Sequence, residues 1–170
     1  MTASIRLEDC ENPGEPQRIH AVNQAAFGGS FEADLVDRLR TEGHALLSLV
    51  AEIEGVIVGH VLFSRMAIKT PSGLIPAVAL APLAVLPEYQ RRGIGGELTR
   101  RGIELLRARQ ERIVLVLGHP GYYPKFGFSA EKASLLESPF PPDAFLALEL
   151  SPGALNGLRG TVLYPPPFGI

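Results

Sequence analysis

Residues 80–106 place an apolar strand, a glycine-containing loop and an amphipathic helix directly one after another. Pro87 prevents the strand that ends at Val85 from continuing, because proline cannot donate to a regular ladder. Apolar residues then recur at helical spacing over 95–111, which predicts a helix there. A chain with this order must lead a strand through a tight loop into the N-terminus of a helix.

The loop has the residue types of an anion site. The first N–H groups of a helix have no internal partners, and the helix dipole adds partial positive charge at the same end. Gly93 and Gly95 allow the backbone to turn sharply and to approach a bulky anion. Arg91 and Arg92 add full positive charges beside it. We therefore expect a site for an anion of pyrophosphate size.

Two other phosphate-binding loops do not match this segment. A P-loop ends in Gly-Lys-Ser/Thr, which is absent here. The dinucleotide fingerprint requires G-x-G-x-x-G, whereas Gly93-Ile94-Gly95 is followed by Gly96-Glu97-Leu98. The predicted antiparallel meander before the loop also disagrees with parallel βαβ units.

The remaining pattern predicts an α/β (α+β) fold with a mixed, largely antiparallel twisted sheet flanked by helices. Glu54-Gly55 predicts a tight hairpin turn. Phe27, Phe31 and the Leu35/Leu39 stripe are expected in the core. The predicted strands cover 5–8, 46–53, 56–68, 75–85, 113–117, 144–150 and 160–163, and helices are predicted from Pro16 to the Gly28-Gly29 stop, from Ser30 through Leu39, over 95–111 and, briefly, over 121–126.

Composition limits the class of protein. The chain has 170 residues, of which 46% are hydrophobic and 20% charged, which fits a single domain over residues 1–170. Its net charge of −2 gives no basic footprint for nucleic acid. The first residues are acidic where a signal peptide needs an apolar run. The longest apolar stretch, 74–86, is interrupted by prolines and too short for a bilayer. We expect a cytoplasmic protein without a membrane partner.

Cysteine and histidine usage predicts neither disulfide nor metal. Cys10 is the single cysteine, so it has no internal partner, and we expect it to be partly buried. The four histidines lack ligand-like spacing, so no metal is expected.

Three segments together resemble one known family. The segment Gln90–Gly95 (QRRGIG) matches [Q/R]-x-x-G-x-[G/A], the signature of the GNAT superfamily of acyl-CoA-dependent N-acyltransferases. Leu83–Pro87 (LAVLP) is similar to the strand end that precedes this signature, and Tyr123–Phe128 (YPKFGF) resembles the Y-x-x-x-G-F element of the family. The form LGHPGYYPKFGF is most similar to the small YhbS-like predicted acetyltransferases.

The resemblance implies acetyl-CoA as acyl donor and no metal. The main chains of Leu83 and Val85 would hold the pantetheine arm, and an N–H near Leu83 would polarise the thioester carbonyl. Pro82 suits such a site because it interrupts the ladder, although it also fits a simple edge or bulge. The implied cofactor-binding residues are Leu83, Ala84, Val85, Gln90, Arg91, Arg92, Gly93, Ile94, Gly95 and Gly96.

Tyr123 is the expected general acid that protonates the CoA thiolate. A phenol with an ordinary pKa of about 10 can donate to a leaving group whose thiol has a pKa of about 8.5. The alternative is a packing tyrosine, and Tyr122 lies beside it. The spacing to Gly127-Phe128 favours Tyr123.

The base is less well specified by the sequence. The strand 75–85 contains no ionisable residue, although many relatives use a glutamate there. His119 is the candidate base because histidine titrates near physiological pH, and its alternative role is to fix the turn His119-Pro120-Gly121. His60 on the predicted third strand fits a satisfied core histidine better than a base.

The predicted function is transfer of the acetyl group of acetyl-CoA to an amine, by direct attack in a ternary complex. The alternative is an acyl-CoA-binding sensor or regulatory module without turnover. It is favoured by the missing strand glutamate and by Val116 and His119, which stand where the family commonly has Asn and Ala. No motif specifies the acceptor, and an exposed sheet edge would allow a homodimer.

Overall fold

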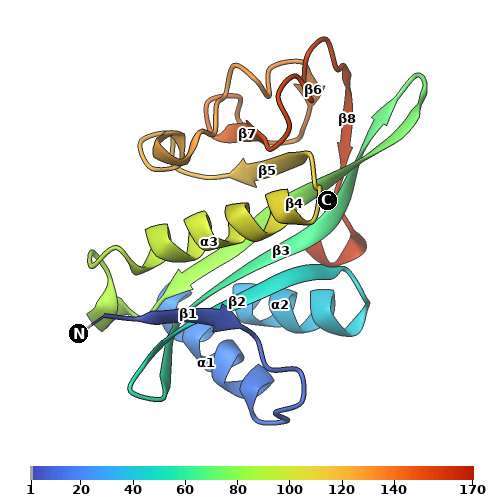
Figure 1. Ribbon diagram of the computed structural model, residues 1–170. Coiled ribbons are helices and arrows are strands. Elements are labelled where there is room, and N and C mark those ends of the chain that lie inside the picture. Colours follow the sequence, from blue (N-terminus) through green and yellow to red (C-terminus); the bar gives the residue numbers. More distant parts are fainter. Residues whose placement is uncertain (1) are drawn as a thin grey trace. The chain divides into compact units, whose positions relative to one another are not determined.

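The computed structural model describes residues 2–170, in which the predicted strands and helices follow the predicted order and one short strand, Leu136–Glu137, was not predicted (Figure 1). The strands are β1 Ser4–Leu7, β2 Ala45–Ile53, β3 Val56–Thr70, β4 Gly73–Val85, β5 Ile113–Leu117, β6 Leu136–Glu137, β7 Phe145–Glu149 and β8 Gly160–Leu163. The α-helices are α1 Glu15–Phe27, α2 Phe31–Thr41 and α3 Ile94–Ala108, and short 3-10 turns cover Pro87–Tyr89, Tyr123–Phe126 and Pro166–Phe168. None of these helices is long and apolar enough to cross a bilayer.

The strands form a mixed sheet with the order β1-β2-β3-β4-β5-β7, and β8 pairs with β3 and β6. β1–β2, β3–β8 and β5–β7 are antiparallel. β4 and β5 run parallel, with Val78 opposite Val114, and β6 is parallel to β8. The predicted mixed, largely antiparallel sheet is confirmed.

The described residues group into two compact units that do not follow the chain order. The first unit contains the chain up to Phe63 together with Pro82–Gly102, and the second contains Ser64–Ala81 and Ile103–Ile170. β3, β4 and α3 therefore each contribute residues to both units. The single domain over residues 1–170 stays a prediction.

In the first unit, helices cover both faces of the sheet. A Cβ on Gly59 of β3 would meet Leu98 and Ile94 of α3, at 3.1 and 3.2 Å. The next residue, His60, contacts Asn23 of α1 at 3.1 Å between the side-chain nitrogens. Because neighbouring strand residues point to opposite faces, the first turns of α3 and helix α1 lie on opposite sides of β3.

The helix stripe of α2 is buried as predicted, but two aromatic residues are not. Leu35 and Leu39 are 6% and 0% exposed. Phe27 and Phe31 are 45% and 66% exposed, so their predicted place in the core is wrong. The reason is their position at helix ends: α1 stops at Gly28, with φ of 72°, and Phe31 is the first residue of α2.

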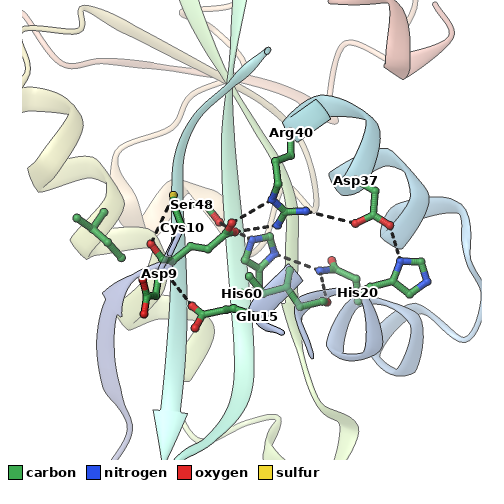
Figure 2. Close-up of polar contacts among 12 residues, drawn as sticks. Asp9, Cys10, Glu15, His20, Asp37, Arg40, Ser48 and His60 are labelled. Carbon is green, nitrogen blue, oxygen red and sulfur yellow. Dashed lines mark hydrogen bonds and ion pairs between the residues drawn. The ribbon is translucent and has the colours of Figure 1, made fainter. Parts of the chain in front are cut away.

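Cys10, in the loop between β1 and α1, is free and exposed. The expectation that it is partly buried is wrong, because the residue precedes α1 in a loop that the sheet does not cover. Its Sγ lies 4.0 Å from the carbonyl oxygen of Glu8 (Figure 2).

The second unit has its own hydrophobic core between β5, β7 and the C-terminal segment. Tyr164 and Phe168 in the proline-rich end pack against this core, with ring centroids 5.0 Å apart. Tyr164 also meets Phe140 edge-to-face at 5.6 Å. The buried members include Met66, Ile68, Ala77, Ala79, Ile113, Leu115, Ala133, Leu136, Phe145, Ala147, Leu155 and Val162.

Helix α3 ends at Ala108, so the predicted end at Glu111 is wrong. Gln110 adopts a left-handed φ of 63° and stops the helix. The N–H of Glu111 donates to the Leu106 carbonyl at 3.0 Å. The N–H of Gln110 donates to the Arg107 carbonyl, also at 3.0 Å. This is the Schellman pattern, in which glycine is the usual residue at the left-handed position.

Candidate active site

The end of β4 presents one half-exposed face in the first unit. Pro82 and Ala84 are buried, whereas Leu83 and Val85 are half-buried. This alternation is the normal period of a strand, so the side chains of Leu83 and Val85 point to the more open face. The predicted pantetheine residues therefore share one face of the strand.

Gln90 stabilises the passage from this strand to the loop. Its Nε2 donates to the Val85 carbonyl at 3.0 Å, across the short turn Pro87–Tyr89. The N–H of Leu86 donates to the Val58 carbonyl at 2.9 Å, which ties the turn to β3. The signature glutamine thus binds the protein's own backbone, a structural role that the motif alone did not predict. Its contact with the cofactor stays a prediction.

The loop before α3 turns through two left-handed residues. Arg91 has φ of 64° and Gly93 has φ of 83°. A Cβ on Gly93 would meet no atom within 4 Å, so the backbone conformation, not crowding, requires glycine there. Arg91 and Arg92 are exposed, and the Arg92 guanidinium lies 5.3 Å from the Tyr89 ring centroid. Positive charge and a tight turn therefore occur together.

The first turn of α3 directs backbone donors toward this loop. The N–H of Glu97 donates to the Gly93 carbonyl at 3.0 Å and opens the helical ladder. The N–H groups of Ile94, Gly95 and Gly96 precede that bond, and such groups are available to an anion. The Thr99 hydroxyl donates to the Gly95 carbonyl at 2.8 Å and stabilises the same turn.

Tyr123 lies in the second unit, in the short turn Tyr123–Phe126. Its ring meets Phe128 edge-to-face at 5.7 Å and Tyr122 at 5.0 Å. Burial, followed by the neighbouring Tyr122, raises the pKa of Tyr123 to about 12. The phenol therefore holds its proton at neutral pH and is a donor.

His119 is exposed and organises the turn that leads to Tyr123. Its Nδ1 accepts a hydrogen bond from the N–H of Gly121 at 3.0 Å. Its carbonyl accepts from the N–H groups of Tyr122 and Tyr123, at 3.0 and 3.3 Å. The ring proton of neutral His119 is therefore on Nε2. These contacts support the turn role, and the base role stays a prediction.

The predicted site residues thus fall into two groups. The cofactor-binding set from Leu83 to Gly96 forms one continuous segment of the first unit. Tyr123 and His119 share one turn of the second unit.

Comparison with known proteins identifies the family. Residues 12–130 match the family model described as "Acetyltransferase (GNAT) domain". The chain belongs to the GNAT acetyltransferase family. It is 34% identical to the uncharacterized N-acetyltransferase YhbS of Escherichia coli K12 over 157 residues, 91% of this chain and 93% of the relative. It is 50% identical to the uncharacterized N-acetyltransferase YjhQ of the same organism over 112 residues, which are 65% of this chain and 62% of YjhQ.

Solved structures agree with this GNAT assignment. The crystal structure of E. coli YhbS in complex with CoA matches with a TM-score of 0.90 and 33% identity, covering 100% of this chain and 93% of that one. A GNAT acetyltransferase from Brucella melitensis in complex with acetyl-CoA matches with a TM-score of 0.81 and 34% identity, covering 98% and 97%. The predicted family, including its YhbS-like branch, and the GNAT fold are confirmed.

The GNAT chain also contains a buried polar network around His60 (Figure 2). Glu8 accepts from Ser48 Oγ at 2.7 Å and from Arg40 at 2.8 Å. Because a carboxylate only accepts, Ser48 must in turn accept the Nε2–H of His60, at 2.9 Å. Nδ1 of His60 then accepts from Asn23 Nδ2 at 3.1 Å.

Burial lowers the pKa of His60 to about 3. The ring is 0% exposed, neutral and bonded at both nitrogens, so the prediction of a satisfied core histidine is confirmed. Its partners Asn23 and Ser48 lie on α1 and β2, and Glu8, which accepts from Ser48, follows β1. No local sequence pattern could have identified these residues.

One group in the first unit of this GNAT protein combines histidine with carboxylates. Ligand atoms of His20, Asp34 and Asp37 lie within 4.8 Å of one another, across α1 and α2. His20 Nδ1 is 2.8 Å from Asp37 Oδ2, and Arg40 also contacts Asp37, at 3.3 Å (Figure 2). The histidine spacing could not reveal this group because it joins two helices. The absence of a metal stays a prediction.

Proposed function

We propose that this GNAT protein binds acetyl-CoA along Leu83–Gly96 and transfers the acetyl group to an amine by direct attack in a ternary complex. The observation that carries the proposal is the left-handed turn at Gly93, which leads the half-exposed end of β4 into the N-terminus of α3. The similar YhbS and Brucella structures, which contain CoA and acetyl-CoA, support it.

The pyrophosphate of the cofactor would bind at the start of α3. The N–H groups of Ile94, Gly95 and Gly96 supply donors, and Arg91 and Arg92 supply charge. The pantetheine arm would continue the hydrogen-bonding pattern of β4, beside the main chains of Leu83, Ala84 and Val85. Gln90 would act by holding the Val85 carbonyl, and so the strand end, in place.

The reaction needs a neutral amine, a stabilised oxyanion and a proton for the leaving thiolate. The amine nitrogen forms a bond to the acetyl carbon, and a main-chain N–H near Leu83 stabilises the oxyanion. The C–S bond then breaks, and Tyr123 gives its proton to the thiolate. The raised pKa keeps Tyr123 protonated, so its hydroxyl can donate a hydrogen bond to the sulfur as negative charge develops there. His119 is the base expected from the sequence, but its Nδ1 accepts the Gly121 N–H, which favours its turn role. The proton of the amine would then pass to solvent water.

The decisive test is release of CoA from acetyl-CoA against a panel of amines: a polyamine, free amino acids, an aminoglycoside and a peptide N-terminus. We expect release with at least one amine, and a drop in kcat of roughly 10²-fold or more in Tyr123→Phe, with unchanged acetyl-CoA affinity. Equal kcat in variant and wild type would remove the acid role.

The second candidate is a GNAT-like sensor that binds acyl-CoA without turnover. It is favoured by β4, whose residues Gly73–Val85 include no ionisable side chain. Calorimetric binding of acetyl-CoA with no CoA release for any amine of the panel would establish it. The acceptor, a homodimer through a sheet edge, the absence of nucleic-acid partners and a cytoplasmic location stay predictions from the sequence.

A further inference from the structure

Gly118 follows β5 and lies directly beneath the ring of Tyr123. Its N–H donates to the Ala144 carbonyl at 2.9 Å, which extends the pairing of β5 with the segment before β7. A Cβ on Gly118 would overlap Cδ2 and Cε2 of Tyr123. Gly118 is not among the residues with positive φ, so its backbone conformation is open to any residue. The three nearest atoms that a Cβ would meet all belong to the ring of Tyr123, so this ring is the first obstacle to a side chain here.

The ring of Tyr123 also has two aromatic contacts. Phe128, which is 2% exposed, meets it edge-to-face at 5.7 Å, and Tyr122 meets it at 5.0 Å. The main chain is held as well, because the N–H of Tyr123 donates to the His119 carbonyl. Gly118, Phe128 and Tyr122 therefore all limit where the Tyr123 ring can lie.

We propose that Gly118 is a positioning residue for Tyr123: the missing side chain gives the phenol the place from which it protonates the thiolate. This inference rests on the proposed acid role of Tyr123. A methyl group at position 118 displaces the ring while leaving the backbone of β5 unstrained. A displacement of about 1 Å at a reacting group can cost on the order of 10²-fold in rate.

The test compares Gly118→Ala, Tyr123→Phe and the double variant by CoA release from acetyl-CoA, with the fastest amine of the panel or, without one, with water as acceptor. We expect Gly118→Ala to lower kcat by about 10- to 100-fold, with unchanged KM for acetyl-CoA. In the Tyr123→Phe background the same change should have little further effect, because the hydroxyl that it misplaces is already gone. Gly14→Ala, whose new Cβ would make only ordinary contacts of 3.4 Å or more, is the control.

Two results would overturn the inference while the acid role stands: wild-type kcat in Gly118→Ala, or full additivity with Tyr123→Phe. Wild-type kcat in Tyr123→Phe itself would instead overturn the acid role and the inference with it. If Gly118→Ala lowers the Tm, the double variant Gly118→Ala/Tyr123→Ala is compared with Tyr123→Ala. An equal Tm in these two proteins supports the overlap of ring and methyl group. A lower Tm in the double variant refutes it.

Discussion

His60 is a buried histidine whose charge state is fixed by its surroundings. Ser48 and Asn23 occupy both ring nitrogens, and burial lowers the pKa of the ring from 6.5 to about 3. The unfolded chain binds a proton below pH 6.5, whereas the folded chain does not until about pH 3. His60 therefore contributes stability that is fully present above pH 6.5 and is lost as the pH falls toward 3.

We expect the free energy of unfolding to fall from pH 6.5 to pH 5, with a contribution from His60 of at most about 1.4 kcal/mol per pH unit. In His60→Gln this contribution disappears, so its curve should be flatter. Glu8, whose pKa is lowered from 4.5, acts mainly below this window and does not obscure the comparison. Urea unfolding at several pH values measures both curves, and parallel curves would contradict the assignment.

His119 has a base role and a turn role that two substitutions can separate. Asn can accept the Gly121 N–H with its side-chain oxygen but cannot take a proton, whereas Ala can do neither. Because Nδ1 is already an acceptor, we expect His119→Asn to keep most of kcat and His119→Ala to lose more. A loss of roughly 10²-fold or more in both variants would instead identify His119 as the base.

At the scale of elements, the loop before α3 makes the sharpest prediction. Gly93 and Gly43 both have left-handed φ, 83° and 80°, and a Cβ on either would meet no atom within 4 Å. Valine at either position therefore costs similar backbone strain, about 1–2 kcal/mol. Only Gly93→Val places a side chain in the proposed pyrophosphate site. Calorimetry should show at least about a tenfold loss of acetyl-CoA affinity in Gly93→Val but none in Gly43→Val. Equal affinities would remove the site from this loop.

The sequence correctly predicted the elements that are specified by residues close together in the chain. Glu54-Gly55 marks a hairpin, and both residues have positive φ, as the tight turn requires. The prediction failed for two other elements. Gln110 ends α3 in a left-handed conformation that glycine normally adopts, so no glycine marked the end of the helix. The strand Leu136–Glu137 is too short to show an alternating pattern.

In the candidate site, too, the sequence revealed features made by consecutive residues and missed those that depend on contacts in the folded chain. The glycine loop could be found because its residues are consecutive. The bond from Gln90 to the Val85 carbonyl depends on a turn that the motif does not describe. The overlap of Gly118 with Tyr123 depends on how a side chain folds back, which no spacing rule states.

At the scale of the whole molecule, the borders between the two units fall inside regular elements. The chain passes from one unit to the other within β3, within β4 and within α3. Linkers between independent domains are instead exposed and irregular. The two units therefore have no connecting segment that a protease could cut while both stay folded.

Limited trypsin digestion tests this organisation. Lys132 lies in an exposed turn of the second unit, whereas Arg65 and Arg101, close to two of the borders, lie in β3 and α3. We expect early fragments to end at exposed sites in turns and loops, such as Arg91, Arg92 and Lys132, because cleavage needs local unfolding and a turn opens at lower cost than a strand or helix. Early fragments that end at Arg65 or Arg101 would show that the borders are flexible, and digestion in urea provides the control in which every site is cut.

Cys10, the single cysteine of the chain, is exposed. In any colorimetric assay that detects liberated CoA through its sulfhydryl, each protein molecule adds one reactive equivalent of its own. The signal from Cys10 equals one thiol per protein molecule, appears before turnover and then stays constant, so it can be mistaken for a burst of product. Alkylating Cys10, or replacing it with Ser, removes the background. Alkylation of the unmodified protein with a reporter dye would label the loop before α1 at this one position.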